Sequence, residues 1–328
     1  MQSTIRGYLL RKKNFLSNQL NQGIYNISIS NFTTISDSKI TEKDIQNLFQ
    51  NYPPLNDGIP VELRQCVQYE NQALYYGEWK KDKNIRHGRG IQLWIDNSKY
   101  EGYWQKDEAS IKGKLYHANG DVYEGEWLND KAHGYGIYTH TNGASYKGFW
   151  KKDKQNGQGI EEWSDGAKYE GNYINGKKCG FGTFSWSDGE CYKGEFRNNN
   201  INGKGTYQWN DNRVYIGEWK NNKMDGQGEF IWPDGRKYKG EYKNDKKEGF
   251  GEFEWTDGRK FKGYWKNGKQ HGEGEFYNPK QGTWRTGIWE EGHRLKWKDE
   301  KELSDNKVYH PSGQVFERLE NEDYHNLN

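Results

Sequence analysis

The sequence predicts an all-β protein made of successive β-hairpins, and three observations support this fold class. A Tyr-x-Gly motif recurs at intervals of 23 residues along most of the chain. The residues around each motif alternate between aromatic or glycine and polar, which is the period of a β-strand. An Asp-Gly or Asn-Gly pair separates the alternating segments, and such pairs favour hairpin turns because glycine adopts a positive φ at low cost.

The repeat extends over most of the chain, where we count ten copies. Tyr75 marks the first copy, Phe261 replaces the tyrosine in the ninth, and a degenerate tenth copy lies at 285–289. The markers between them are Tyr100, Tyr123, Tyr146, Tyr169, Tyr192, Tyr215 and Tyr238. A fixed period of this kind is typical of repeat proteins, in which each unit packs on its neighbours instead of around a closed core.

The two earliest copies are less regular than the others. Gly88 lies 13 residues after Tyr75, and Gly113 lies 13 residues after Tyr100, whereas later copies use 11 residues between marker and Gly-x-Gly motif. Gly113 also has no second glycine two residues further on. We therefore expect a longer loop after each of these two markers.

Each repeat is predicted to place its aromatic residues and glycines on one face of a sheet. Tyr169, Gly171 and Tyr173 alternate with polar residues and so share a face. In the following strand the same face carries Gly180, Gly182, Phe184 and Trp186. Only 31% of the residues are hydrophobic, but 16% are aromatic and 41 are glycine. We therefore expect aromatic rings to fill the space beside the glycines and to form ladders, with ~0.5–1.5 kcal/mol from each ring pair.

Composition excludes several function classes. The 49 basic and 47 acidic residues nearly cancel, so no chain-wide positive field is present to attract nucleic acid. The mean hydropathy of −1.29 and the absence of a long apolar run argue against a membrane-spanning helix. The cysteines, Cys66, Cys179 and Cys191, form no C-x-x-C pair, which favours a reducing compartment without a disulfide framework.

No residue pattern indicates catalysis, a cofactor or a metal ion. His87, His133 and His271 each precede the first glycine of a Gly-x-Gly motif, so we interpret them as features of the repeat. Aspartates of the Asp-Gly pairs are explained by turn chemistry rather than by calcium binding; they are Asp165, Asp188, Asp234 and Asp257. The Gly-x-Gly motif lacks the strand–loop–helix context of a phosphate-binding loop. The sequence therefore predicts a protein that is not an enzyme.

The segments outside the repeats define the predicted domain organisation: an N-terminal basic arm at 1–60, the repeat array at 61–292 and a charged C-terminal cap or tail at 293–328. A short helix is expected at 41–50, with Thr41 as its N-cap. Candidate anchor residues in the arm are Arg6, Arg11, Lys12 and Lys13. Three interpretations of residues 1–36 stay open: an arm that binds a partner, a basic amphipathic helix for a membrane or a calmodulin-like protein, and a mitochondrial targeting segment.

The repeat closely resembles that of the MORN family. The family pattern is G-x-G-x-x-x-W-x-D/N-G-x-x-Y-x-G-x-W/F, and one copy here matches it at Gly157, Gly159, Trp163, Asp165, Gly166, Tyr169, Gly171 and Tyr173. The resemblance covers about residues 66 to 292. It implies an elongated, single-layer, twisted antiparallel sheet of about ten hairpins, with short arms at both ends.

The sequence leaves two states of the aromatic face open. Either the rings pack fully against one another in ladders, or the face is a partly open trough that binds a partner. Candidate trough residues are Tyr123, Trp127, Tyr146, Trp150, Tyr169, Tyr173, Tyr192, Phe196, Tyr215, Trp219, Tyr238 and Tyr242.

The resemblance to radial spoke head components and other axonemal scaffolds implies a non-catalytic structural rod in a ciliary or cytoskeletal assembly. Its partners would be other protein subunits and not nucleic acid, and self-association stays open. The alternatives are a membrane or phosphoinositide adaptor, for which membrane contact is not favoured, and an accessory subunit of a mitochondrial membrane complex.

Overall fold

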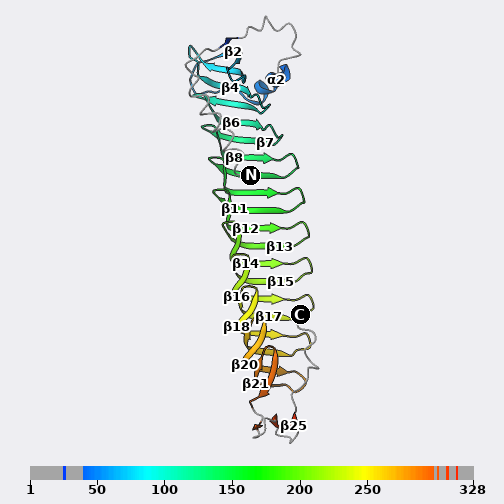
Figure 1. The fold of residues 1–328 in the computed structure, drawn as a ribbon. Coiled ribbons are helices and arrows are strands. Elements are labelled where there is room, and N and C mark those ends of the chain that lie inside the picture. Colours follow the sequence, from blue (N-terminus) through cyan, green and yellow to red (C-terminus); the bar gives the residue numbers. More distant parts are fainter. Residues whose placement is uncertain (1–24, 27–39, 299–300, 303–307, 310–314, 317–328) are drawn as a thin grey trace. The chain divides into compact units, whose positions relative to one another are not determined.

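The computed structural model describes residues 25–26, 40–298, 301–302, 308–309 and 315–316. Most of these residues form β-strands that pair antiparallel with the strands next to them in sequence (Figure 1). The chain divides into two compact units, Met1–Ser187 and Asp188–Asn328. Each unit contains an open, single-layer sheet of hairpins, which confirms the predicted fold class.

In the first unit, β2 to β12 pair in chain order, and the short strand β1 (Tyr25–Asn26) pairs with β2. The bounds are β2 Val61–Gln68, β3 Leu74–Lys80, β4 Arg86–Leu93, β5 Lys99–Gln105, β6 Glu108–Tyr116, β7 Val122–Leu128, β8 Lys131–Thr139, β9 Ser145–Lys151, β10 Lys154–Glu162, β11 Lys168–Ile174 and β12 Lys177–Ser185.

In the second unit, β13 to β22 pair in chain order. The bounds are β13 Cys191–Arg197, β14 Asn200–Gln208, β15 Val214–Lys220, β16 Lys223–Ile231, β17 Lys237–Lys243, β18 Lys246–Glu254, β19 Lys260–Lys266, β20 Lys269–Asn278, β21 Thr283–Glu290 and β22 His293–Trp297. Three two-residue strands, β23 Lys301–Glu302, β24 Val308–Tyr309 and β25 Val315–Phe316, pair among themselves. Strand β22 therefore continues the sheet past residue 292, where the array was expected to end.

The Asp-Gly pairs form the hairpin loops that the sequence predicts. Between β10 and β11, Gly166 N–H donates to the carbonyl of Trp163 at 3.0 Å, and Trp163 N–H donates to the carbonyl of Ala167 at 2.9 Å. Asp165 Oδ1 accepts from Ala167 N–H at 3.0 Å, so the aspartate serves the turn itself. Gly166 has a φ of +89°, and a Cβ there would meet nothing within 4 Å, so backbone conformation alone selects glycine.

The opposite edge of the sheet carries two-residue turns that sequence reasoning did not predict. Lys152 and Asp153 connect β9 to β10 with φ values of 52° and 66°, as in a type I′ turn. Asp153 N–H donates to the carbonyl of Ala132 at 3.0 Å, and Asp153 Oδ1 accepts from Ala132 N–H at 2.8 Å. Asp245 makes the same two bonds to Met224 in the second unit. These two turns are therefore bonded to the previous hairpin by both backbone and side chain.

The first glycine of each Gly-x-Gly motif lies in an irregularity of the strand pairing. Gly157 has a φ of +100°, and the register between β9 and β10 shifts between Gln155 and Gly159. A glutamate of the preceding strand often satisfies the backbone freed by this irregularity: Glu126 Oε1 accepts from Tyr135 N–H at 3.0 Å. The glutamate that follows many Tyr-x-Gly motifs thus has a structural role.

The expectation of two long loops in the early copies is half correct. After Tyr75 the connection from β3 to β4 is longer than elsewhere, running from residue 81 to 85. After Tyr100, however, β5 and β6 are joined by only residues 106–107. Gly113 faces Gly102 and is therefore the second glycine of its motif, while Ile111 occupies the first position with a φ of +65°. The sequence expectation misassigned this copy because Ile111 adopts a conformation usually left to glycine.

Helix α2 (Glu42–Asn51) is close to the predicted helix, and Thr41 caps it. Thr41 Oγ1 accepts from Asp44 N–H at 3.2 Å, and Asp44 accepts from Thr41 N–H at 2.9 Å. Leu48 of α2 belongs to a buried cluster with Ile91 of β4 and Tyr103 of β5. These strand residues alternate with the ladder residues, so α2 covers the sheet face opposite to the aromatic one. We call that opposite face the outer face and the face with the marker tyrosines the aromatic face.

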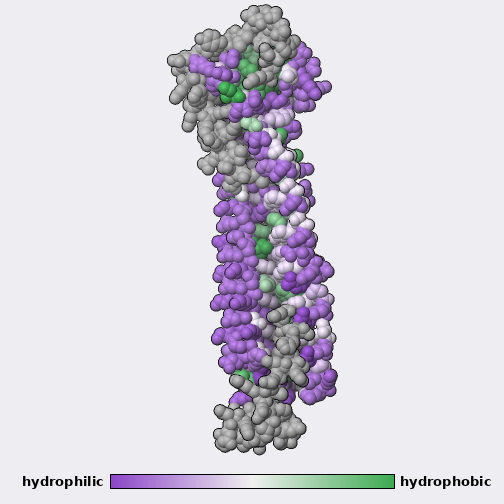
Figure 2. Space-filling model, turned by 45° about the vertical axis from the view of Figure 1, so that its right-hand side comes forward, coloured by the Kyte–Doolittle hydropathy of each residue, from purple (hydrophilic) through white to green (hydrophobic). Residues whose placement is uncertain are grey.

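Elsewhere the outer face is largely polar. Lys262 pairs with Glu252 across two strands, Nζ to Oε1, at 2.9 Å, and Lys114 pairs with Glu124 at 3.2 Å. Figure 2 shows hydrophilic side chains over most of the visible surface, with smaller hydrophobic areas between them. Exposed ion pairs of this kind contribute little to stability, so we expect the packing of the aromatic face to contribute more than they do.

Candidate functional site

Each marker tyrosine of the aromatic face lies over a pair of facing glycines. Gly240 and Gly251 are paired across β17 and β18, and a Cβ on either would collide with the ring or hydroxyl of Tyr238. The Tyr238 hydroxyl donates to the carbonyl of Glu241 at 3.1 Å. This burial raises the pKa of Tyr238, because the phenolate would lose its hydration.

The marker rings join into a ladder of edge-to-face contacts. The Tyr238 ring lies 5.2 Å from Tyr242 of the same strand and 5.1 Å from Trp265 of the next repeat, with nearly perpendicular planes. In the first unit, Tyr146 makes the same contacts with Trp150 at 5.1 Å and Tyr173 at 5.2 Å. The predicted ladder packing is therefore present in both units, and it uses the T-shaped geometry that aromatic rings prefer.

The twelve candidate trough residues all lie in this ladder. Their exposed fractions are between 0 and 6%: Tyr123 0%, Trp127 3%, Tyr146 0%, Trp150 5%, Tyr169 0%, Tyr173 2%, Tyr192 0%, Phe196 5%, Tyr215 0%, Trp219 6%, Tyr238 0% and Tyr242 5%. Of the two states left open by the sequence, these rings are in the packed one. Binding of a partner by these twelve residues stays a prediction. A partner on the aromatic face would first contact the residues that cover the ladder.

A second row of rings, absent from the predicted set, is more accessible. In the second unit it alternates the tryptophan of each hairpin loop with an aromatic residue of the preceding strand. In the second unit, Trp232 lies 4.4 Å from Phe230 and 5.5 Å from Phe253, ring centre to ring centre. Trp232 is half-buried, as is Trp255 at the next loop. The sequence signal for this accessible row was the tryptophan of the W-x-D-G motif. A ring beside a loop has fewer neighbouring strands to bury it.

One further position of the repeat faces the aromatic rings. It is the second residue of the strand after the two-residue turn, or the first residue of the strand in the first copy, and its chemistry differs between copies. In chain order it is Arg86, Ala109, Ala132, Gln155, Lys178, Ile201, Met224, Lys247 and Gln270. We call this the variable position, because it carries a cation, an amide or an apolar side chain within otherwise similar surroundings.

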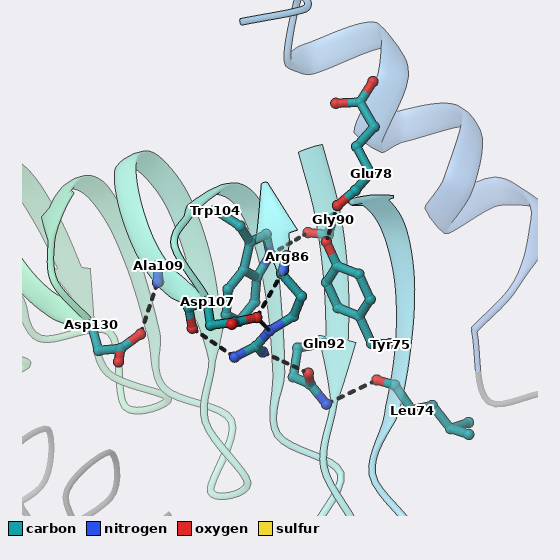
Figure 3. A network of polar contacts seen from close by, with 10 residues as sticks. All are labelled: Leu74, Tyr75, Glu78, Arg86, Gly90, Gln92, Trp104, Asp107, Ala109 and Asp130. Atoms are coloured by element: carbon teal, nitrogen blue, oxygen red, sulfur yellow. Dashed lines mark hydrogen bonds and ion pairs between the residues drawn. The ribbon is translucent and has the colours of Figure 1, made fainter. Parts of the chain in front are cut away.

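Arg86 fills the variable position of the first copy and is held by a network of polar contacts (Figure 3). Its guanidinium lies 3.9 Å from the ring centre of Trp104. It donates to the carbonyl of Asp107 at 2.6 Å and to Gln92 Oε1 at 3.0 Å, and Gln92 in turn donates to the carbonyl of Leu74 at 3.0 Å. The Asp107 carboxylate also lies 3.3 Å from Arg86 Nε, so this buried charge is neutralised within the protein.

Lys178 fills the same position of a later copy in the first unit. Its Nζ lies 2.9 Å from Glu161 Oε2 and 4.7 Å from the ring centre of Trp163. Glu161 also accepts from the hydroxyl of Tyr173 at 2.8 Å. A carboxylate among the rings thus neutralises this second cation.

Of the three histidines that precede a Gly-x-Gly motif, His87 has a carboxylate partner. His87 Nε2 lies 2.8 Å from a carboxylate oxygen of Asp57. Within the described ranges, no group of three or more His, Cys, Asp and Glu residues is arranged to hold a metal ion. The candidate anchor residues Arg6, Arg11, Lys12 and Lys13 lie outside the described residues. Among the helices that the structure describes, none is long and apolar enough to cross a membrane.

Comparison with known proteins gives a family match over most of the array. The model of the MORN repeat matches nine segments: 75–99, 100–122, 123–145, 146–168, 169–191, 192–212, 215–235, 238–258 and 261–285. Of the tenth copy expected from the sequence, only Arg285 lies within these matches, although β21 forms there. No curated protein matches the chain.

Solved structures give only weak matches. The SAS-4 (dCPAP) TCP domain of Drosophila melanogaster, solved with a proline-rich motif of Ana2, is 10% identical over 47% of this chain and 84% of that one, with a TM-score of 0.30. The CPAP G-box domain is 11% identical over 70% of this chain and 100% of that one, with a TM-score of 0.31. The TCP10 domain of Danio rerio CPAP with a STIL peptide is 13% identical over 72% and 96%, with a TM-score of 0.25. Scores this low carry no functional argument.

Proposed function

Because this chain belongs to the family of MORN-repeat proteins, which are repeat scaffolds or interaction modules, we propose that it is a non-catalytic scaffold in a ciliary or cytoskeletal assembly. The observation that carries this proposal is the repetition itself. Nine matched copies place the same hairpin, ladder and turn at regular intervals. Such an array suits a part that spaces and holds other proteins, since each repeat contacts its neighbours and adds surface in equal steps.

The outer face offers a surface for those proteins. Tyr135 and Phe149 pair edge to face at 5.5 Å and remain 40% and 48% exposed. Phe250 and Tyr264 form the same pair in the second unit at 5.6 Å, with 40% and 55% exposed. Exposed aromatic pairs surrounded by charged residues are typical of protein interfaces. At the second copy, Tyr103 of this face is covered by the chain's own α2.

The partners we propose are other protein subunits of the assembly. The balanced charge gives no reason to expect nucleic acid, and the candidate trough residues remain part of the proposed interaction surface. An axonemal location, similar to that of radial spoke head components, belongs to this proposal.

Detergent extraction of the source cells, followed by cross-linking mass spectrometry of the fraction that holds the protein, tests the proposal. We expect the protein in the insoluble axonemal or cytoskeletal fraction, cross-linked to other subunits. Release with membranes, or recovery in mitochondria, would overturn it in favour of an adaptor or an accessory subunit.

A matched pair of variants tests the outer face directly. Phe149→Ser should reduce cross-links near β9 without loss of folding, because its side chain is 48% exposed. Lys147→Ser changes an exposed residue on the same face of the same strand and should leave the cross-links of the other residues near β9 unchanged.

A further inference from the structure

Three copies of the repeat place a cation at the variable position: Arg86, Lys178 and Lys247. Two of these cations have a carboxylate within the protein. Arg86 lies beside Asp107, and Lys178 lies beside Glu161. Lys247, in the second unit, is the third, and its surroundings differ in one respect that has a consequence for binding.

Lys247 points into a box of four aromatic rings. Its Nζ lies 4.6 Å from the ring centre of Phe253, 4.7 Å from Trp265, and 5.2 Å from both Trp232 and Tyr238. Within residues 40–298 the structure gives this ammonium no ion pair and no hydrogen bond. The rings attract the charge through their electron-rich faces, but they offer no acceptor for its three N–H groups.

The missing carboxylate follows from a single residue difference between copies. Glu161 lies 17 residues before Lys178, and Phe230 lies 17 residues before Lys247. Phe230 is a buried member of the second ring row, with 6% exposed. The copy of Lys247 therefore keeps the lysine and the rings but has an apolar ring where the other copy has the acid.

A buried ammonium without a counter-charge is unfavourable, because its desolvation is not compensated. Burial, with the positive charge of Arg236 adding to it, lowers the pKa of Lys247 to about 7. As a whole residue, Lys247 keeps part of its surface exposed. A carboxylate placed beside Nζ would supply the acceptor and the charge that Glu161 supplies to Lys178.

We propose that Lys247 is a binding site for the carboxylate of an aspartate or glutamate in a partner polypeptide segment that lies on the aromatic face of the second unit. The half-buried Trp232 and Trp255 would contact apolar residues on either side of that acid, since they are the accessible rings nearest to it in the second row. This inference rests on the proposed scaffold function and names the chemistry of one partner segment.

Selection of short random peptides displayed on phage, against the full chain, tests the inference. We expect the selected peptides to be enriched in Asp or Glu flanked by apolar residues. Replacing that acid by its amide should weaken binding to the wild-type protein at least about tenfold in fluorescence anisotropy, as for other charge-assisted hydrogen bonds. The same replacement should have little effect on binding to Lys247→Met.

Two further variants separate charge recognition from folding. Methionine is the native residue at this position one repeat earlier, Met224, so Lys247→Met is expected to keep the fold. Phe230→Glu should recreate the internal pair of Glu161 with Lys178 and abolish the acid dependence while leaving Lys247 in place. Lys178→Met, the control in the first unit, should leave acid-dependent binding intact.

The possible failures are distinguishable. If peptides bind the protein with no dependence on an acid or on Lys247, the inference is wrong and the proposed scaffold function stands. If the protein neither selects peptides nor cross-links to other proteins in cells, both fail. If a carbodiimide cross-links Lys247 to a carboxylate within 299–328 of the protein alone, its own C-terminal segment occupies the site and the proposal of a partner is overturned.

Discussion

The packing of each marker tyrosine over two glycines makes a strong prediction for Gly251→Ala. An added Cβ would lie 2.6 Å from Cζ and 2.7 Å from Cε2 of Tyr238, whereas carbon atoms in contact are ~3.5–4.0 Å apart. The ring is fully buried and held by Tyr242 and Trp265, so it cannot move aside without losing those contacts.

Overpacking of this kind costs ~1–3 kcal/mol, and loss of the tyrosine hydrogen bond and edge contacts adds ~1–2 kcal/mol. Alanine stabilises a strand by ~0.5–1 kcal/mol relative to glycine, and this gain offsets a small part of the stability lost. We therefore expect Gly251→Ala to lower the free energy of unfolding by about 2–4 kcal/mol, measured by urea denaturation with tryptophan fluorescence.

Two comparisons make this prediction refutable. Lys239→Ala, on the exposed face of the neighbouring strand, should change stability by less than ~0.5 kcal/mol. In a Tyr238→Ala background, Gly251→Ala should cost little, because the colliding ring is gone. Equal losses for Gly251→Ala and Lys239→Ala, or additive losses in the double variant, would refute the packing argument.

Three other predictions concern single contacts. Tyr238→Phe should cost only ~0.5–1.5 kcal/mol in the same assay, because it removes one hydrogen bond and Phe261 already occupies this place in the next copy. Asp245→Gly should lower stability by ~1 kcal/mol by removing the acceptor of Met224 N–H, while Asp245→Asn keeps that acceptor and should be nearly neutral; equal effects would contradict this role. Since the pKa of Lys247 is about 7 in the folded protein and higher when unfolded, the unfolded state binds more protons between pH 7 and 9. Wild-type stability should therefore rise over this range, by at most ~1.4 kcal/mol per pH unit, and Lys247→Met should not show the rise in thermal melts.

The features set by local sequence were predictable. The period of 23 residues and the alternation around each tyrosine were sufficient to predict the hairpins and the shared face of Tyr169, Gly171 and Tyr173. The turn at Gly166 was predictable for the same reason, since a single glycine with positive φ is a local requirement.

The features set by contacts between copies were not predictable. The two-residue turn at Lys152 and Asp153 carries no glycine, and its aspartate is explained only by a bond to Ala132, 21 residues earlier. The first position of its motif could not be recognised at Ile111, because glycine is expected there. The strand pairing, and not the preference of isoleucine, imposes the positive φ. That the candidate trough rings are buried also depends on neighbouring copies, which cover each ring from both sides.

The variable position separates two properties of the protein. The tyrosine ladder, the glycine pairs and the bonded turns are nearly the same in every copy, whereas the residue at this position changes from arginine to alanine, glutamine, lysine, isoleucine and methionine. A mutation there alters the charge and shape of one step of the aromatic face while the framework around it keeps its contacts. The order of these residues along the chain is therefore where the copies differ most, and selection or an engineer can change it one copy at a time.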